Sequence, residues 1–158
     1  MLDYNLKGTL DIQILIIDDN KIAIELLDFY LSQINCISMH ANNGMQAMEL
    51  VKSYSFSLIL CDLNMPVMSG FDFITSIRSM HEYDLIPIIV ISSEENEDNI
   101  VSILNTGADD FISKPINEHV FLSKVKATLL KSESKKLKTL QTFQKQIDIS
   151  DSKILYCV

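Results

Sequence analysis

Three aspartates follow apolar runs in the N-terminal half of the chain. Asp18 and Asp19 come directly after IQILII (residues 12–17), and Asp62 comes directly after LILC (residues 58–61). If these runs are neighbouring parallel strands, the three carboxylates meet at one edge of a sheet. Carboxylates that meet at one edge of a sheet repel one another unless one is protonated or a cation lies among them. Hard oxygen ligands favour Mg²⁺ over softer metals. The spacing therefore predicts a Mg²⁺ site.

Each aspartate also has a plainer explanation when it is taken alone. One of Asp18, Asp19 and Asn20 could cap a following helix, and Asp62 could be an ordinary loop residue. Ser92 and Lys114, however, follow two further strand-like segments. Polar residues at four strand ends favour a functional site over four separate local roles.

The elements that must position these residues alternate along the chain from Ile12 onward. Apolar strand-like runs are separated by amphipathic stretches, which is typical of a parallel sheet with helices on both faces. Five such units in about 120 residues predict an α/β, flavodoxin-like, doubly wound fold with a five-stranded parallel sheet, strand order 2-1-3-4-5 and five helices. The predicted strands are residues 12–17, 37–41, 58–61, 86–91 and 110–113.

Helical spacing predicts which side chains face the core. In the first helix the predicted inward stripe is Ala23, Leu26, Leu27, Tyr30, Leu31 and Ile34. The fourth predicted helix ends before Gly107, because glycine is the commonest residue at the position just beyond a helix end. The fifth helix is expected to start near Asn117 and to carry Val120, Phe121, Val125 and Leu129 inward.

The chain divides by composition into three parts. Residues 1–10 are an N-terminal extension, residues 11–131 form the folded domain, and residues 132–158 are a helical linker or tail. The last part is polar and Lys-rich, and it contains neither Gly nor Pro. Leu130, Leu137, Leu140 and Ile147 hint at a heptad stripe in this region, although the pattern is not sustained over three to four heptads.

Bulk properties exclude several classes of protein. A formal charge of −8 and a pI near 4.7 argue against a domain that binds nucleic acid directly, because phosphate contact needs clustered Lys and Arg. No apolar run reaches the roughly 20 residues that span a bilayer, so we expect no membrane segment and a cytoplasmic location. Cys36, Cys61 and Cys157 match no disulfide or zinc spacing; the first two are expected to be buried thiols, and the third has no assigned role.

Five segments resemble the receiver domain of two-component response regulators. They are IIDDN (16–20), ANNGMQAMEL (41–50), LILCDLNMPVMSG (58–70), VISS (90–93) and GADDFISKP (107–115). Each string is weak by itself, but their order and spacing are specific. All five fall where a strand end was expected to carry a site or where a helix begins.

The resemblance implies a mechanism. Asp62 accepts a phosphoryl group from the phosphohistidine of a sensor histidine kinase or a phosphotransfer protein and becomes an aspartyl phosphate. Asp19 and Asp62 ligate Mg²⁺, Asp18 does so directly or through water, and the backbone carbonyl of Asn64 adds an oxygen. Lys114 pairs with the phosphoryl group, and the Lys114–Pro115 bond is expected to be cis.

The resemblance also assigns regulatory roles. Ser92 and Phe111 are the switch pair, and Asn64 and Glu94 modulate the loss of the phosphoryl group. The fourth helix, fifth strand and fifth helix then signal to an output domain or effector protein, and a homodimer on phosphorylation is allowed. On this reading the chain is not an enzyme, since it catalyses only its own phosphorylation and dephosphorylation.

Three alternatives stay open at this point. A haloacid dehalogenase-like phosphatase also uses an Asp nucleophile and Mg²⁺, but it carries a second Asp two residues further on, where this chain has Asn64. A pseudo-receiver would work by binding alone, although every residue needed for phosphorylation is present. The chain is either a free-standing regulator or the input half of a longer one, and its Lys-rich tail favours the second.

Overall fold

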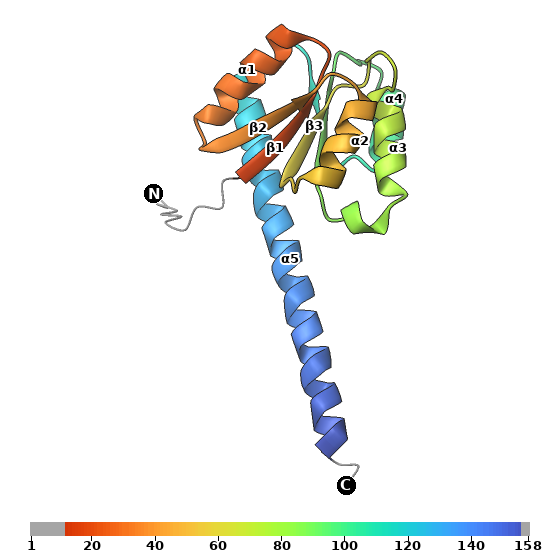
Figure 1. Ribbon diagram of the computed structural model, residues 1–158. Coiled ribbons are helices and arrows are strands. Elements are labelled where there is room, and N and C mark those ends of the chain that lie inside the picture. The colour runs from red at the N-terminus through yellow and green to blue at the C-terminus, as the bar shows by residue number, and fades with distance from the viewer. Residues whose placement is uncertain (1–11, 156–158) are drawn as a thin grey trace.

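The computed structural model describes residues 12–155, and the side chains of residues 12–150. Five parallel strands form one sheet in the order β2-β1-β3-β4-β5, and Figure 1 shows β1 between β2 and β3. The predicted fold class is thus confirmed. The strands are β1 (Ile12–Ile17), β2 (Cys36–Ala41), β3 (Leu58–Cys61), β4 (Ile88–Ser92) and β5 (Asp110–Ser113).

The start of β4 was predicted two residues too early. Ile86 is apolar and looks like part of the strand, but its carbonyl accepts a hydrogen bond from Arg78 instead of a neighbouring strand. Pro87 has no N–H to donate to a ladder, although its carbonyl accepts from Ile59 N at 3.0 Å. The regular strand therefore begins at Ile88 and includes Ser92 at its end.

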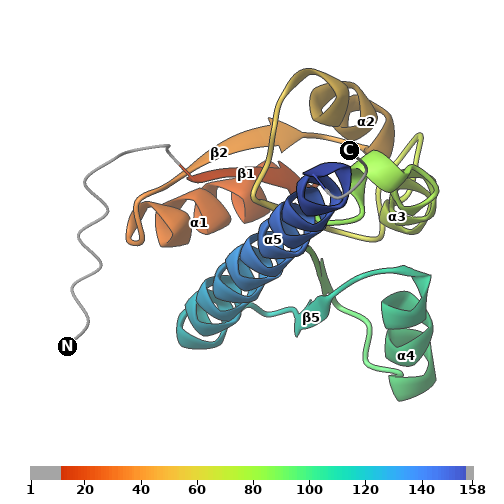
Figure 2. The ribbon, with the colours of Figure 1, turned by 90° about the horizontal axis from the view of Figure 1, so that it is seen from below.

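Helices cover both faces of the sheet. The helices are α1 (Lys21–Ser32), α2 (Gly44–Ser53), α3 (Gly70–Arg78), α4 (Glu97–Thr106) and α5 (Glu118–Leu155), with a short 3₁₀ turn, η1 (His81–Tyr83). Alternate residues of β1 point to opposite faces: Leu15 and Ile17 pack in the core below α2, α3 and α4, whereas Ile14 and Ile16 pack below α1 and α5. In Figure 2, α1 and α5 lie side by side, and the rings of Tyr30 and Phe121 join them at 5.7 Å between centroids.

Polar side chains fix where the helices begin. Asn20, Asn43, Ser69 and Asn96 precede α1 to α4, and each accepts hydrogen bonds from backbone N–H groups of the first turn. Asn117 does the same for α5, accepting from Val120 N at 3.0 Å. Gly107 follows α4 with φ of +124°, as expected for a glycine at a helix end.

Two of the predicted inward stripes were partly wrong. In α1 the buried residues are Ile24, Leu27 and Leu31, whereas Leu26 is exposed. In α5, Phe121 and Val125 are fully buried, but Val120 faces solvent. The helix α1 is apolar around most of its circumference, so spacing alone did not fix which side meets the sheet.

Helix α5 continues well beyond the sheet. It runs without a break to Leu155 and projects from the rest of the domain (Figure 1). Ser132 is its last buried residue, and residues 133–150 are all exposed. The division of the chain at residue 131 stays a prediction, because one helix spans it, and residues 1–10 lie outside the described residues.

Two other expectations concern cysteines and membranes. Cys61 is buried and Cys36 is half-buried, and both are free thiols; Cys157 lies outside the described residues. Between residues 12 and 155, no helix is both long enough and apolar enough to cross a membrane.

Candidate metal and phosphoacceptor site

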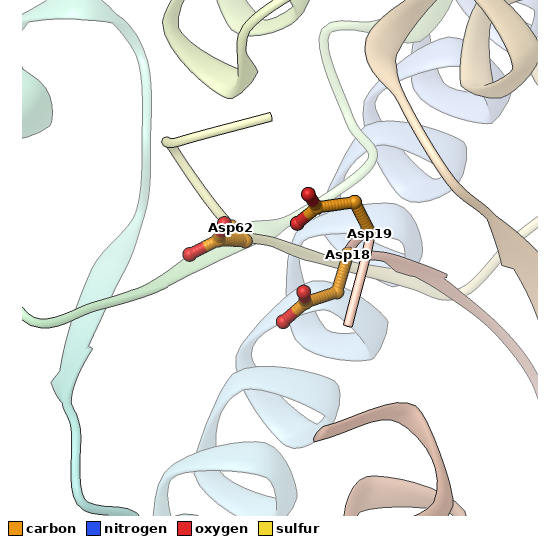
Figure 3. Close-up of side chains that lie close together, drawn as sticks. All are labelled: Asp18, Asp19 and Asp62. Carbon is orange, nitrogen blue, oxygen red and sulfur yellow. The ribbon is translucent and has the colours of Figure 1, made fainter. Parts of the chain in front are cut away.

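The register of the central strands brings the three aspartates together. Ile17 of β1 pairs with Cys61 of β3, so both strands end at the same level. The backbone continues this alignment, since Asp62 N donates to Ile17 O at 2.8 Å and Asp18 N donates to Ala41 O at 3.0 Å. Figure 3 shows the side chains of Asp18, Asp19 and Asp62 gathered at this edge.

The carboxylates form a group of the size that a divalent cation needs. One oxygen from each of Asp18, Asp19 and Asp62 lies within 4.8 Å of the other two. Asp18 and Asp62 are only 3% and 7% exposed, while Asp19 is open to solvent. Three hard oxygen donors with one open side fit a cation that keeps some of its water, as Mg²⁺ does.

A lysine completes the charge balance. Lys114 Nζ donates to Asp18 Oδ2 and to Asp62 Oδ1, both at 3.2 Å. Burial by itself lowers the pKa of Lys114, but the charges of Asp62 and Asp18 outweigh it and raise the pKa above its ordinary value. Lys114 is therefore a cation at neutral pH, and its bond to Pro115 is cis, as predicted.

Asp62 lies in an environment that opposes its ionisation. Burial is the largest cause that raises the pKa of Asp62 above its ordinary value, and the charges of Asp18 and Asp19 add to it. Lys114 acts in the opposite direction without cancelling the shift. A further cation at this site would lower the energy of the ionised carboxylate.

The geometry removes the plainer explanation for the first two aspartates. Asn20 caps α1, accepting from Ile22 N at 2.9 Å and from Ala23 N at 3.4 Å. Asp18 Oδ1 accepts from Asn20 N, which lies before the helix, and Asp18 Oδ2 accepts from Lys114 Nζ. Neither Asp18 nor Asp19 is needed to begin α1.

The predicted switch residues lie on the adjacent strands. Ser92 is 1% exposed at the end of β4, and its hydroxyl accepts a long hydrogen bond of 3.4 Å from Glu94 N. Phe111 is half-buried on β5 and packs against the core below α2, α3 and α4. These positions place both residues near the site edge of the sheet, and their switch roles stay predictions.

The two predicted modulating residues differ in their surroundings. Asn64 is exposed in the loop after β3. Glu94 accepts a hydrogen bond from Asn96 N at 2.9 Å, and this bond is the main cause that lowers the pKa of Glu94. Its carboxylate thus supports the start of α4 here, and its influence on phosphoryl loss stays a prediction.

Gly70, the last residue of the LILCDLNMPVMSG segment, lies closer to Asp62 than the sequence reveals. A Cβ at Gly70 would lie 2.0 Å from the backbone oxygen of Asp62. Gly70 N also donates to Leu63 O at 3.0 Å, which holds the loop after β3 against the start of α3. The sequence shows that a glycine follows Asp62, but only the structure shows that a larger residue at this position would collide with the Asp62 backbone.

The fold is a doubly wound α/β domain with an acidic cluster and a lysine at one edge of its sheet, and comparison with known proteins identifies its class. Residues 14–126 match the family model of the response regulator receiver domain. The chain therefore belongs to the response regulator receiver family.

Its relatives are regulators and signal receiver domains. Over 122 residues it is 35% identical to the transcriptional regulatory protein SrrA of Staphylococcus aureus, a match that covers 77% of this chain and 49% of SrrA. A solved receiver domain of a signal transduction histidine kinase from Syntrophus aciditrophicus is 30% identical, with a TM-score of 0.71 over 75% of this chain and 90% of that one. A two-component response regulator from Clostridium difficile is 28% identical, with a TM-score of 0.69 over 74% and 94% of the two chains. The chain spans about half the length of the curated relatives that it matches.

Proposed function

We propose that Asp62 accepts a phosphoryl group from the phosphohistidine of a histidine kinase or phosphotransfer protein. The observation that carries this proposal is the convergence of Asp18, Asp19, Asp62 and Lys114 at one edge of the sheet. A carboxylate is a competent nucleophile for phosphorus, and most of the catalysis of this step is positioning and charge neutralisation. The reaction forms an O–P bond at Asp62 and breaks the P–N bond, and the imidazole leaves with a proton.

The residues at the site divide the work. Asp18, Asp19 and Asp62 would hold Mg²⁺ together with the backbone carbonyl of Asn64. When bound, the cation would neutralise part of the charge on the phosphoryl oxygens. Lys114, held between Asp18 and Asp62, is positioned to move from the carboxylate to a phosphoryl oxygen, and Ser92 would donate to another.

The same proposal covers signalling. Phosphorylation adds charge and acceptor oxygens beside the end of β4, which would bias Ser92 and Phe111 between two arrangements. The surface formed by α4, β5 and α5 would pass this change to an output domain or effector. It contains a cleft of about 530 Å³ lined by Glu94, Phe111 and Lys124 among others, which is supporting evidence for a contact surface. The phosphorylated form would pair with a second copy through it.

We also propose that the exchange takes place in the cytoplasm and that the chain turns over no other substrate. Free thiols at Cys36 and Cys61 support a reducing compartment. Assay of a small phosphate ester with the purified chain tests the second point, and steady turnover would contradict it.

The decisive experiment is incubation with a small acyl phosphate and Mg²⁺, followed by intact-protein mass spectrometry. Wild type should gain one phosphoryl group, and Asp62→Asn should gain none. Asp98→Asn, an exposed change on α4, is the matched control and should behave like wild type. If the wild-type chain gains no phosphoryl group from a donor that phosphorylates another receiver domain, the protein is a pseudo-receiver that acts by binding alone.

A further inference from the structure

The exposed half of α5 carries apolar side chains that the domain does not cover. Leu137, Leu140, Phe143 and Ile147 are 53% to 65% exposed, although each is large and apolar. An isolated helix of the length of residues 133–150 is marginal in water, because most helix stability in proteins comes from packing of an apolar face. A contiguous apolar stripe on such a helix indicates an interaction surface.

The stripe has the spacing of a coiled-coil seam. With Leu137 at heptad position a, Leu130 is also at a, and Leu140 and Ile147 are at d. A strict a/d stripe is narrower than the face that a helix presents to a globular core. Phe143, at g, widens the seam on one side.

This seam is turned away from the domain. Ser132 is buried against the domain and lies two residues beyond Leu130, which is 53% exposed. At about 100° per residue, the two side chains point to nearly opposite sides of the helix. Residues 133–150 are exposed, and α5 projects away from the sheet (Figure 1), so a second helix can lie along the seam without displacing any packed element.

The lysines of this segment leave the seam positions free. Four of its five lysines, Lys131, Lys135, Lys138 and Lys145, fall at the outer positions b and f, and only Lys136 flanks the seam, at g. The segment is basic, whereas the chain as a whole has a charge of −8. Because these lysines face outward on both helices, no ammonium group has to be buried in the contact between them.

Two polar seam residues decide the orientation. In a parallel pair, Glu133 at d would meet Glu133 of the second copy, and like charges placed together across an interface are strongly unfavourable. In an antiparallel pair, a residues pack against d residues. The register that puts Leu137 opposite Leu140 also puts Leu130 opposite Ile147 and Glu133 opposite Gln144, whose amide can donate to the carboxylate.

We infer that residues 130–147 of α5 pair with the same segment of a second copy of this chain as an antiparallel two-stranded coiled coil. The same register places Lys136 of one helix near the Phe143 ring of the other, a favourable arrangement for a cation and an aromatic face. This dimer does not depend on Asp62 or Mg²⁺. It is distinct from the pairing that phosphorylation would cause.

Sedimentation equilibrium of the full chain in EDTA, without phosphodonor, tests the dimer separately from the proposed phosphorylation. Two heptads form a small interface, so we expect a dissociation constant on the order of 1–100 μM. Ile147→Asn should weaken the dimer about tenfold or more, whereas Ile149→Asn should change it less than about twofold. These two isoleucines are similarly exposed, 53% and 55%, but only Ile147 lies in the seam. A wild-type chain that stays monomeric up to about 500 μM, or equal effects of the two changes, overturns the inference.

Disulfide trapping tests the orientation. In a Cys157→Ser background, a mixture of Leu137→Cys and Leu140→Cys chains should form disulfide dimers several times faster than either variant alone. Lys138→Cys, at an outer position, is the control and should trap little when mixed with either. Faster trapping of Leu137→Cys alone would show a parallel pair and reject the antiparallel register. Binding of a monomeric wild type to anionic phospholipid vesicles, lost in Ile147→Asn, would assign the stripe to a membrane surface and overturn the dimer.

Discussion

Asp62 lies in surroundings that make its ionisation less favourable than it would be in water, mainly because the carboxyl group is buried. Asp18 and Asp62 are nearly buried, and the single ammonium of Lys114 is shared between them. Clustered carboxylates of this kind serve chemistry at the expense of stability, because their repulsion exists only in the folded state. Substitution of the site residues should therefore change the free energy of unfolding as well as phosphorylation.

The first prediction concerns Asp62 and pH. Because the folded state raises the pKa of Asp62, the folded protein binds that proton more tightly than the unfolded chain does, and stability falls as pH rises from the ordinary Asp value through the folded value. Asp62→Asn cannot ionise. In EDTA at pH 7 its free energy of unfolding should therefore be about 1 kcal/mol larger than that of wild type. This difference should vanish as the pH falls below about 4. Urea unfolding at several pH values measures it, and a variant less stable than wild type at pH 7 contradicts it.

The second prediction concerns the metal. A cation that binds only the folded state stabilises it by mass action, so Mg²⁺ at ten times its dissociation constant should add about 1.4 kcal/mol to wild type. The double variant Asp18→Asn, Asp19→Asn should lose this response, while Asp98→Asn should keep it. Thermal unfolding across a Mg²⁺ titration provides the measurement. An equal response of the double variant would place the cation elsewhere.

The third prediction concerns Gly70, the glycine that packs against the backbone of Asp62. Gly70→Ala puts a methyl group 2.0 Å from the backbone oxygen of Asp62, and that backbone must move. We expect a loss of about 1–3 kcal/mol of stability and slower phosphorylation of Asp62. Gly44→Ala is the comparison, since its closest neighbour at 2.8 Å is the flexible side chain of Met68, and it should be milder on both counts. Normal phosphorylation by Gly70→Ala would show that the loop adapts freely.

At the scale of elements, the side chain of Arg78 connects the segments that lead into β4 and β5. The Arg78 guanidinium, at the end of α3, donates to the carbonyls of Gly107, Tyr83 and Ile86 at 2.8 to 2.9 Å and to Asp109 Oδ2 at 3.1 Å. The same Asp109 oxygen accepts from Ile88 N at the start of β4. Arg78 thus fixes the chain that enters β4 against the chain that enters β5.

The fourth prediction follows from this contact. Arg78→Met keeps the apolar stem but leaves three carbonyls and the Asp109 carboxylate without the guanidinium, so we expect a loss of about 2–4 kcal/mol. Arg78→Lys should recover less than half, because a single ammonium cannot reach all four acceptors in the same plane. Urea unfolding measures both variants. A loss below about 1 kcal/mol would mean that water replaces these bonds.

Elements with strong local signals could be predicted from the sequence, and elements fixed by distant contacts could not. The ends of β1 and β3 followed from continuous apolar runs stopped by Asp18 and Asp62, so the acidic cluster was predicted before any geometry. The start of β4 was wrong because Ile86 is as apolar as Ile88, and the difference between them is a hydrogen bond from Arg78. The Arg78 contacts themselves span 5 to 31 residues and leave no local pattern.

At the scale of the whole molecule, the domain and the projecting part of α5 depend on different interactions. The core on both faces of the sheet is complete by Ser132, and residues 133–150 are all exposed. Helix propensity alone holds an isolated segment of this length only marginally. The unfolding of the domain and the melting of the tail should therefore be separable.

Truncation after Glu133 tests this separation and gives the last prediction. In dilute solution, where the full chain is monomeric, the truncated chain should melt within about 2 °C of the full chain, because a difference of that size in a domain of about 120 residues corresponds to only a few tenths of a kcal/mol. It should also keep its response to Mg²⁺, since no site residue lies beyond Lys114. At concentrations where the full chain dimerises, the helix signal of the tail should melt at a higher temperature than in dilute solution, because association stabilises the paired helices, whereas the domain should melt as it does in the truncated chain. A truncated chain that melts about 10 °C lower even in dilute solution would show that the projecting helix supports the domain directly.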